Sequence, residues 1–175
     1  MNFTTERLTV RPFLKQDIED VYTIYKDELT CKYLLHEHWT NENKEIEFEK
    51  KLENSTLSKN NALSLAVVSS SSKVIGDLSI WYTSMKDTVE VGYCFSKDEN
   101  GKGYATEAMN GLVNKLFTDF KLHRIQATLD ARNTASKKVC ERIGMRQEAY
   151  FVQDYWSKNE WTDSIVFGML LSDLK

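Results

Sequence analysis

The sequence predicts a mixed α/β fold in which a strand runs through a glycine-rich turn into a long amphipathic helix. Apolar and polar residues alternate over residues 89–95, which is the period of a strand. Apolar residues then recur at steps of three and one over residues 105–120, which indicates a helix of about four turns. Similar alternating segments occur along most of the chain, so this unit belongs to a sheet that carries helices.

The other strands are predicted from alternating or continuous apolar, β-branched segments. In chain order they cover residues 5–10, 62–68, 74–82, 125–131, 145–156 and 161–171. Pro12 closes the first strand. The serines at 69–72 form a turn between the second and third, and residues 157–160 form a hairpin turn between the last two.

The first predicted helix begins at Asp17, a suitable N-cap, and its apolar stripe reaches Tyr25. A second helix is expected from Thr40 to about residue 57, with Ile46 and Leu52 facing the core.

A third, short helix covers residues 134–143. Gly144 follows it in the C′ position, where glycine is favoured because the chain adopts a left-handed conformation there.

The composition is that of an ordinary globular protein, and we expect one domain over residues 1–175. The chain is 41% hydrophobic and 28% charged, and a chain of this length buries roughly 70% of its unfolded surface. A net charge of -3, without a basic run, argues against nucleic acid as a partner. No apolar run approaches the ~18 residues of a membrane span, and the N-terminus lacks the pattern of a secretory signal. We therefore expect a cytoplasmic protein that does not bind membranes.

The three cysteines are odd in number and lack metal-type pairing, which fits reduced thiols. His36 and His38 follow Cys31 closely, but one thiol beside a His-x-His pair is not a recognised zinc framework. We expect no metal site and interpret residues 36–39 as a polar loop.

The turn at residues 100–106 has the features of an anion site. A strand that delivers two glycines into a helix start leaves several backbone N–H groups unpaired at the positive end of the helix dipole, which favours phosphate. The spacing excludes two familiar phosphate motifs. Lys102 has no glycine five positions upstream and is followed by Gly103, and Thr106 stands where a dinucleotide fingerprint needs a third glycine.

Two motifs resemble those of the GCN5-related N-acetyltransferase (GNAT) superfamily. Gly103 and Ala105 occupy the last two fixed places of its pyrophosphate loop, Gln/Arg-x-x-Gly-x-Gly/Ala, and Asn100 stands where Gln or Arg is usual. Residues 133–145 resemble its Asn-x-x-Ser/Ala-x-x-Val/Leu-x-Glu-Lys/Arg-x-Gly-Phe motif, with Met145 in place of Phe. The opening segment, the strand that contains Glu-Val-Gly-Tyr and the turn after it also resemble the ribosomal-protein-alanine (Rim-type) subgroup.

The resemblance implies the GNAT fold, a mostly antiparallel twisted sheet of about six to seven strands with splayed central strands and about four helices. It also implies acetyl-CoA as cosubstrate, with the pantetheine arm in the gap between the splayed strands. Backbone groups of Cys94 and Phe95 would bind this arm, and Asn133 would contact it with its amide or cap the short helix. The pyrophosphate would bind the turn made of Asn100, Gly101, Lys102, Gly103, Tyr104, Ala105 and Thr106.

Acetyl transfer needs a neutral amine, a polarised carbonyl group and a proton for the departing thiolate. Many relatives place a Tyr on the short helix for the last task, and Cys140 stands at that position here. Ser136, four residues earlier on the same helix face, would contact the cosubstrate and is the Rim-type candidate for stabilising the thiolate, although both side chains could be ordinary packing. Glu90 is the candidate base, unless it only faces solvent. Glu160 and Asp163 are weaker candidates.

The predicted function is acetyl-CoA-dependent transfer of an acetyl group to a primary amine by direct attack, with Trp39 as an apolar wall of the acceptor pocket. At pH 7 an α-amine is neutral roughly 14% of the time and a lysine side chain roughly 0.04%, which favours protein N-termini or amino acids over lysine side chains. A polyamine or a drug stays open as the acceptor. A non-catalytic acyl-CoA sensor or an interaction domain is the alternative. Aromatic residues between positions 150 and 161 suggest a homodimer surface.

Overall fold

A computed structural model describes residues 1–174 of the chain. Within that range the strands are β1 (Phe3–Thr4), β2 (Leu8–Pro12), β3 (Ser55–Ser58), β4 (Asn61–Ser69), β5 (Val74–Tyr82), β6 (Thr88–Phe95), β7 (Arg124–Asp130), β8 (Arg146–Ser157) and β9 (Glu160–Leu170). They form one sheet in the order β1-β2-β4-β5-β6-β7-β9-β8, and β3 pairs with β4. Every neighbouring pair is antiparallel except β6 and β7. The predicted α/β class and mostly antiparallel sheet are confirmed.

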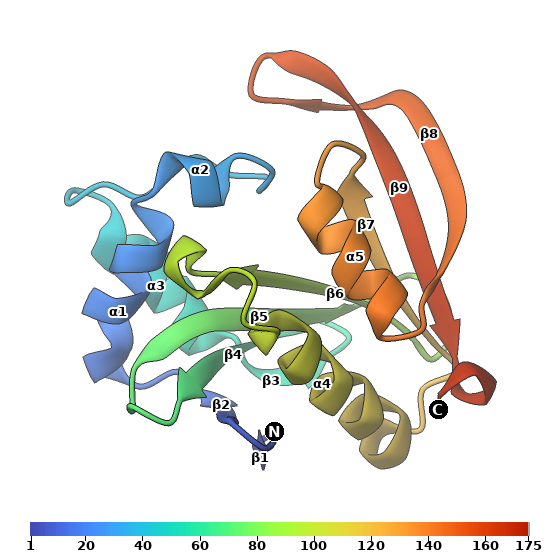
Figure 1. The fold of residues 1–175 in the computed structure, drawn as a ribbon, viewed down its shortest axis with the longest axis horizontal. Helices are drawn as coiled ribbons and strands as arrows, with labels where there is room; N and C mark the ends of the chain where they lie inside the picture. The colour runs from blue at the N-terminus through green and yellow to red at the C-terminus, as the bar shows by residue number, and fades with distance from the viewer. Residues whose placement is uncertain (175) are drawn as a thin grey trace.

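Helices lie on both sides of the sheet (Figure 1). They are α1 (Ile18–Tyr25), α2 (Glu28–Cys31), α3 (Lys44–Glu53), α4 (Tyr104–Phe120) and α5 (Thr134–Arg142). Short 3-10 turns occur at Lys15–Asp17, Lys97–Glu99 and Leu171–Asp173. Figure 1 shows α1, α2 and α3 grouped on one side and α4 and α5 on the other. The sheet lies between these two groups of helices.

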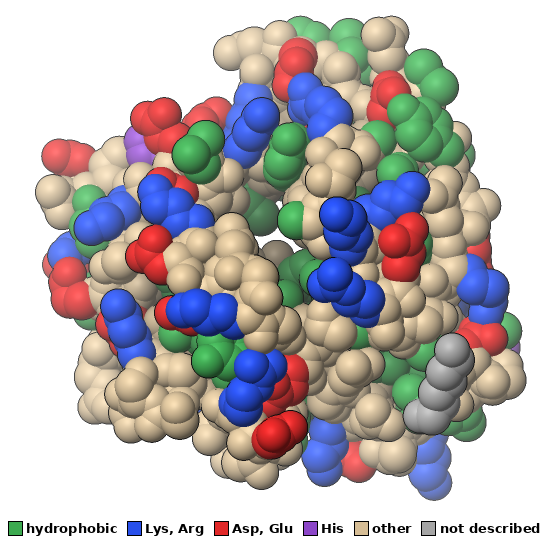
Figure 2. All heavy atoms as spheres, in the orientation of Figure 1, with side chains coloured by type: hydrophobic (Ala, Val, Ile, Leu, Met, Phe, Trp, Pro, Cys, Tyr) green, Lys and Arg blue, Asp and Glu red, His purple; other side chains and the backbone are tan. Residues whose placement is uncertain are grey.

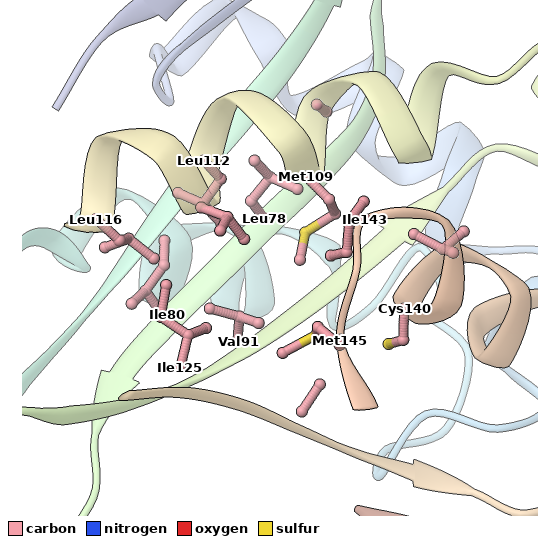
Figure 3. Packing of buried hydrophobic residues seen from close by; sticks show 14 of the residues in the cluster. Leu78, Ile80, Val91, Met109, Leu112, Leu116, Ile125, Cys140, Ile143 and Met145 are labelled. Atoms are coloured by element: carbon pink, nitrogen blue, oxygen red, sulfur yellow. The ribbon is translucent and has the colours of Figure 1, made fainter. Parts of the chain in front are cut away.

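The sheet is buried on both faces near its centre, because successive residues of β4 pack alternately into two cores. The larger core lies under α4 and α5, and the smaller one lies under α1 and α3. In Figure 3, Met109, Leu112 and Leu116 of α4 pack over Leu78 and Ile80 of β5. Each of these buried side chains stabilises the fold by about 1.5–3 kcal/mol. This packing fixes the position of α4, and therefore of its N-terminal end.

The strands β6 and β7 separate in the middle of the sheet, as the resemblance implied. Their parallel pairing covers only three positions and ends at the pair Glu90 and Gln126. β6 then continues to Phe95 along β5, and β7 continues to Asp130 along β9. The remaining part of β6 therefore presents an unpaired edge toward a gap.

The predicted second helix is too long. α3 begins at Lys44 and ends at Glu53, and the residues after it form β3 instead of a last helical turn. Ile46 is exposed and Phe48 occupies the inward position, whereas Leu52 packs against the smaller core as predicted. The alternation of Lys and Glu along this segment gave too weak an apolar stripe to fix the face or the end of the helix.

Asp17 does not cap α1 with its side chain. Its buried carboxylate instead accepts hydrogen bonds from the Arg11 guanidinium at 2.7 and 2.9 Å, and from the Leu14 amide at 2.8 Å. The prediction failed because an N-cap motif in the sequence does not reveal a cation on the preceding strand.

Candidate active site

A cavity of about 530 Å³ lies beside the gap between β6 and β7. Its lining comes from β5, β6 and β7, from the beginning of α5, from the segment after α2, from α3 and from the turn between β8 and β9. Figure 2 shows a hollow at the centre of the molecule, with hydrophobic and basic side chains around it. Of the predicted site residues, Glu90, Cys94, Asn133 and Ser136 line this cavity.

The turn before α4 has the backbone geometry of an anion cradle. Gly101 and Gly103 have φ angles of 78° and 82°, a left-handed conformation that a side chain would strain. Within residues 1–174, none of the amides of residues 101–106 donates a hydrogen bond to the protein. The amide of Glu107 is the first that bonds back into the turn, to the carbonyl of Gly103 at 3.0 Å. Six successive N–H groups are thus free for an acceptor at the N-terminal end of a long helix.

An ion pair braces this turn from the connection between β1 and β2. The Arg7 side chain donates to Glu107 through Nε at 2.7 Å and to the carbonyl of Lys102 at 3.0 Å. It also lies over the Tyr104 ring, with 4.5 Å between the guanidinium carbon and the ring centroid. Burial alone would raise the pKa of Glu107, but hydrogen bonds from Thr5 and Arg7 hold it below its ordinary value. The carboxylate stays ionised and fixes the turn to the N-terminal strand.

Lys102 does not point freely into the turn. Its ammonium forms an ion pair with Glu99 at 2.8 Å, so its positive charge is already compensated. Asn100 ends the preceding 3-10 turn, with its amide bonded to the carbonyl of Lys97 at 3.1 Å. The backbone, rather than these two side chains, supplies the polarity of the turn.

Along β6, the backbone N–H and C=O groups of successive residues point alternately to β5 and to the gap. The amides of Ser96 and Thr83 bond to Ile75 and Thr88 across the β5–β6 pair, so the even-numbered residues of β6 direct their backbone groups to β5. Phe95 therefore faces the gap as expected. Cys94 was also predicted to face the gap, but its backbone groups point to β5. The backbone groups of Tyr93 face the gap instead.

The beginning of α5 brings several polar groups to the gap. The Asn133 side-chain oxygen accepts a hydrogen bond from the Ser136 amide at 3.1 Å, so its capping role is confirmed and its NH₂ group stays available. The Tyr93 hydroxyl donates to the carbonyl of Ser136 at 2.9 Å and lies 3.6 Å from the Cys140 sulfur. Tyr93 thus joins β6 to α5 across the gap.

Ser136 and Cys140 occupy different environments, although they lie on one helix face. Ser136 lines the cavity, whereas Cys140 is fully buried in the larger core, as Figure 3 shows, and does not line the cavity. Burial raises the pKa of the Cys140 thiol to about 11 and also raises that of Tyr93. Ser136 is the candidate that a bound molecule in the gap could touch.

Glu90 lies where β6 and β7 part. Its carboxylate accepts one hydrogen bond, from the Gln126 side chain at 2.8 Å. The weaker candidates are committed elsewhere: Glu160 pairs with Arg132 at 2.8 Å, and Asp163 accepts hydrogen bonds from the Tyr150 hydroxyl and the Gln153 amide. Glu90 is therefore the carboxylate best placed to meet an amine.

Aromatic side chains form the wall of the cavity opposite α5. Trp39, the predicted apolar wall of the acceptor pocket, is buried, lines the cavity and stacks on Tyr25 with 4.6 Å between ring centroids. Behind it, Asp77 accepts hydrogen bonds from the Tyr25 hydroxyl at 2.6 Å and from Lys51 at 2.9 Å. This buried network keeps the wall rigid.

All three cysteines are free and buried, as predicted for reduced thiols. The Cys31 thiol donates to the carbonyl of Tyr25 at 3.2 Å. In residues 1–174 no cluster of three or more His, Cys, Asp or Glu side chains could hold a metal ion. No helix in this range is long and apolar enough to cross a membrane.

Comparison with known proteins decides the family. Residues 7–146 match the family model described as an acetyltransferase (GNAT) domain. The chain belongs to the GNAT acetyltransferase family. An uncharacterised N-acetyltransferase of Bacillus subtilis, YnaD, is 30% identical over 170 residues, which cover 97% of each protein. A solved GNAT-family acetyltransferase from Bacillus anthracis is 31% identical, with a TM-score of 0.88, over 97% of this chain and 98% of the other.

More distant GNAT structures share the fold. A spermidine N-acetyltransferase from Vibrio cholerae, solved with CoA and spermine, is 18% identical with a TM-score of 0.79, over 95% of this chain and 96% of the other. A ribosomal-protein-S5-alanine acetyltransferase from Vibrio fischeri is 24% identical with a TM-score of 0.74, over 100% of this chain and 99% of the other. The names of these two relatives give different acceptors, so the shared fold does not identify the acceptor of the present GNAT protein.

Two features of this GNAT site were missed by sequence reasoning. The brace between Arg7 and Glu107 joins residues 100 positions apart, and only their presence in the two Rim-type segments hinted at a link. Tyr93 was noticed as part of a motif, but its contact with α5 depends on the separation of β6 and β7, which no local pattern reveals.

Proposed function

We propose that this acetyltransferase is an acetyl-CoA-dependent N-acetyltransferase that transfers the acetyl group to a primary amine by direct attack. We also propose that residues 1–175 form one N-acetyltransferase domain. The observation that supports the function best is the continuity of the free β6 edge with the turn at residues 101–106, whose amides have no acceptor in the described chain. An edge strand binds the amides of an extended arm, and the turn binds a diphosphate.

Each residue would have a separate task. The amides of residues 101–106 would hold the pyrophosphate, and the gap-facing groups of Tyr93 and Phe95 would bind the pantetheine arm. The side-chain NH₂ of Asn133 would contact the same arm. The thioester would then lie beside Ser136 at the end of the gap.

When bound, acetyl-CoA supplies an activated acetyl group, and the chain supplies orientation and proton handling. Glu90 would accept a proton from the acceptor ammonium, directly or through water. The Ser136 hydroxyl would donate a hydrogen bond to the thiolate as the carbon–sulfur bond breaks. Because Cys140 is outside the cavity and its pKa is raised, we assign it to packing.

The deciding experiment is thiol release from acetyl-CoA over a panel of amines, with product identification by mass spectrometry. We expect thiol release that depends on an amine and an N-acetylated product. Binding of acetyl-CoA without turnover on any amine would contradict the proposal and favour a non-catalytic sensor. The three cysteines should react slowly with a thiol reagent, because all three are buried and burial raises the pKa of Cys31 and Cys140 to about 11.

We also propose that the protein is a homodimer that pairs through β8. This strand is at the edge of the sheet, and Tyr150, Phe151, Val152, Trp156 and Trp161 on the β8–β9 hairpin are exposed. Sedimentation equilibrium tests this: a monomer at all concentrations would contradict it.

A further inference from the structure

Seven of the ten charged Asp, Glu, Lys and Arg side chains that line the cavity are paired with one another. Five carboxylates and five Lys or Arg side chains line it. Four of the carboxylates have a cationic partner within 2.9 Å: Glu47 with Lys50, Asp77 with Lys51, and both Asp130 and Glu160 with Arg132. These groups cannot supply a free charge to an acceptor without losing a partner. The unpaired groups therefore decide what the cavity recognises.

Glu90 is the carboxylate of this lining that has no cationic partner in residues 1–174. Gln126 donates to one of its oxygens, so the other is free to accept a hydrogen bond from an ammonium. It lies at the point where β6 and β7 part, and it lines the same cavity as Ser136. Glu90 thus offers one place for one positive charge.

The cavity mouth has the opposite character. Lys32 and Lys158 line it, and neither has a carboxylate partner within the described chain. The Lys158 ammonium donates to the carbonyl oxygen of Cys31 at 2.6 Å and to that of Lys32 at 3.4 Å, where the β8–β9 turn meets the end of α2. The Lys32 ammonium lies over the Tyr33 ring, 5.2 Å from its centroid. The same lining includes the aromatic side chains of Tyr33, Trp39, Trp81 and Tyr155.

A second positive charge on the acceptor would therefore meet either aromatic walls or two ammonium groups that have no carboxylate partner in the described chain. Like charges brought together in a partly desolvated site are strongly unfavourable, and this is how binding sites reject wrong partners. An anionic or neutral group at the same place would be accepted, and an anionic one would be attracted.

We propose that the acceptor is a primary amine that carries its only positive charge at the reacting nitrogen, on a body that is apolar near the amine and anionic at its far end. The proposal rests on the N-acetyltransferase function and selects among its acceptors. It excludes diamines and polyamines, although a structural neighbour is a spermidine N-acetyltransferase.

The test compares kcat/KM for amines of matched length in the thiol-release assay. Aminohexanoate, hexylamine and cadaverine share one alkyl chain and end in carboxylate, methyl and ammonium. We expect kcat/KM to fall in that order, by about tenfold or more from the first to the last. Spermidine, free-amine tripeptides and their acidic and basic variants extend the comparison to other shapes.

Charge reversal at the mouth gives the second measurement. Lys32→Glu should raise kcat/KM for cadaverine relative to aminohexanoate by about tenfold, because the like charge is replaced by an opposite one. Lys158→Glu should act in the same direction. Lys59→Glu, in the exposed turn between β3 and β4 and outside the cavity, is the matched control and should leave the ratio unchanged.

The outcomes separate the two proposals. A diamine or polyamine turned over as fast as the best monocationic amine would overturn the inference, and the N-acetyltransferase function would stand. A preference for monocationic amines that Lys32→Glu and Lys158→Glu both leave unchanged would also overturn it. Thiol release with none of the amines, in a protein that binds acetyl-CoA, would overturn the function and the inference with it.

Discussion

The Ser136 hydroxyl is the group that we expect to act on the departing thiolate, because it lines the cavity and Cys140 does not. Ser136→Ala should lower kcat by roughly ten- to a hundredfold, the effect of losing one hydrogen bond to a developing anion, with little change in the acetyl-CoA KM. Cys140→Ala is the matched control from the same helix face. It should keep kcat and lower Tm, because it leaves a small buried cavity. Full turnover by the Ser136 variant would remove the assignment.

Glu90 carries the proton-transfer role and should be sensitive to loss of charge alone. Glu90→Gln keeps the size and one hydrogen-bond acceptor, yet it should lower kcat/KM by about a hundredfold at neutral pH. The rate should partly recover at high pH, where more of the free amine is already neutral. Glu160→Gln, whose carboxylate pairs with Arg132, is the control. Equal effects of the two substitutions on the pH–rate profile would argue against a special role for Glu90.

The turn before α4 depends on the first strands of the chain, and this dependence can be tested. Arg7→Ala removes the contacts to Glu107, to the Lys102 carbonyl and to the Tyr104 ring. We expect the acetyl-CoA KM to rise by about tenfold while kcat changes little, because the cradle loosens and the reacting groups stay in place. Arg146→Ala is a suitable control, since its side chain is equally exposed but pairs with Glu148 and Asp173 far from the turn. A similar KM in both variants would show that the brace has no part in binding.

Elements with a strong pattern were predicted well, and elements that depend on tertiary contacts were not. The bounds of β5 and the start of α4 follow from alternation and from the two glycines before the helix. The Schellman end of α5 follows from Gly144, whose φ is 89°. The end of α3 was missed because β3 forms only by pairing with β4. Short β1 was missed for the same reason.

For the site, local motifs located the turn and the beginning of α5, since each motif lies in one contiguous segment. They could not show that Tyr93 reaches Ser136, that Lys102 is neutralised by Glu99, or that Cys140 turns into the core. These facts depend on how β6, β7 and α5 are placed around the gap. The resemblance to a family supplied the gap itself, and only the structure supplied the direction of each backbone group along it.

The whole fold should lose stability in acid over a defined range. Hydrogen bonds from Lys97 and Thr30 lower the pKa of Asp27 to about 2 in the folded protein, from the ordinary value of 3.8. Hydrogen bonds from Arg132 also lower the pKa of Asp130, against the effect of its burial. A carboxylate with a lowered folded-state pKa contributes stability that is complete above its unfolded pKa and is lost as the pH falls through the folded one. Tm should therefore be steady near neutral pH and fall between about pH 4 and 2.

Asp27→Asn checks the sign of this effect. The variant should be less stable than the wild type near neutral pH, and the difference should shrink as the pH falls toward 2, because the wild-type carboxylate is then protonated. A difference that grows as the pH falls would contradict the linkage.

The central claim is that the turn at residues 101–106 binds the diphosphate of acetyl-CoA, and calorimetric titration of Gly103→Val with acetyl-CoA tests it most directly. Gly144→Val is the control, because Gly144 has a similar positive φ but lies at the far end of α5. Thermal melts establish that both variants are folded. We predict that Gly103→Val shows no measurable binding while Gly144→Val binds like the wild type. An unchanged affinity in folded Gly103→Val would contradict the account.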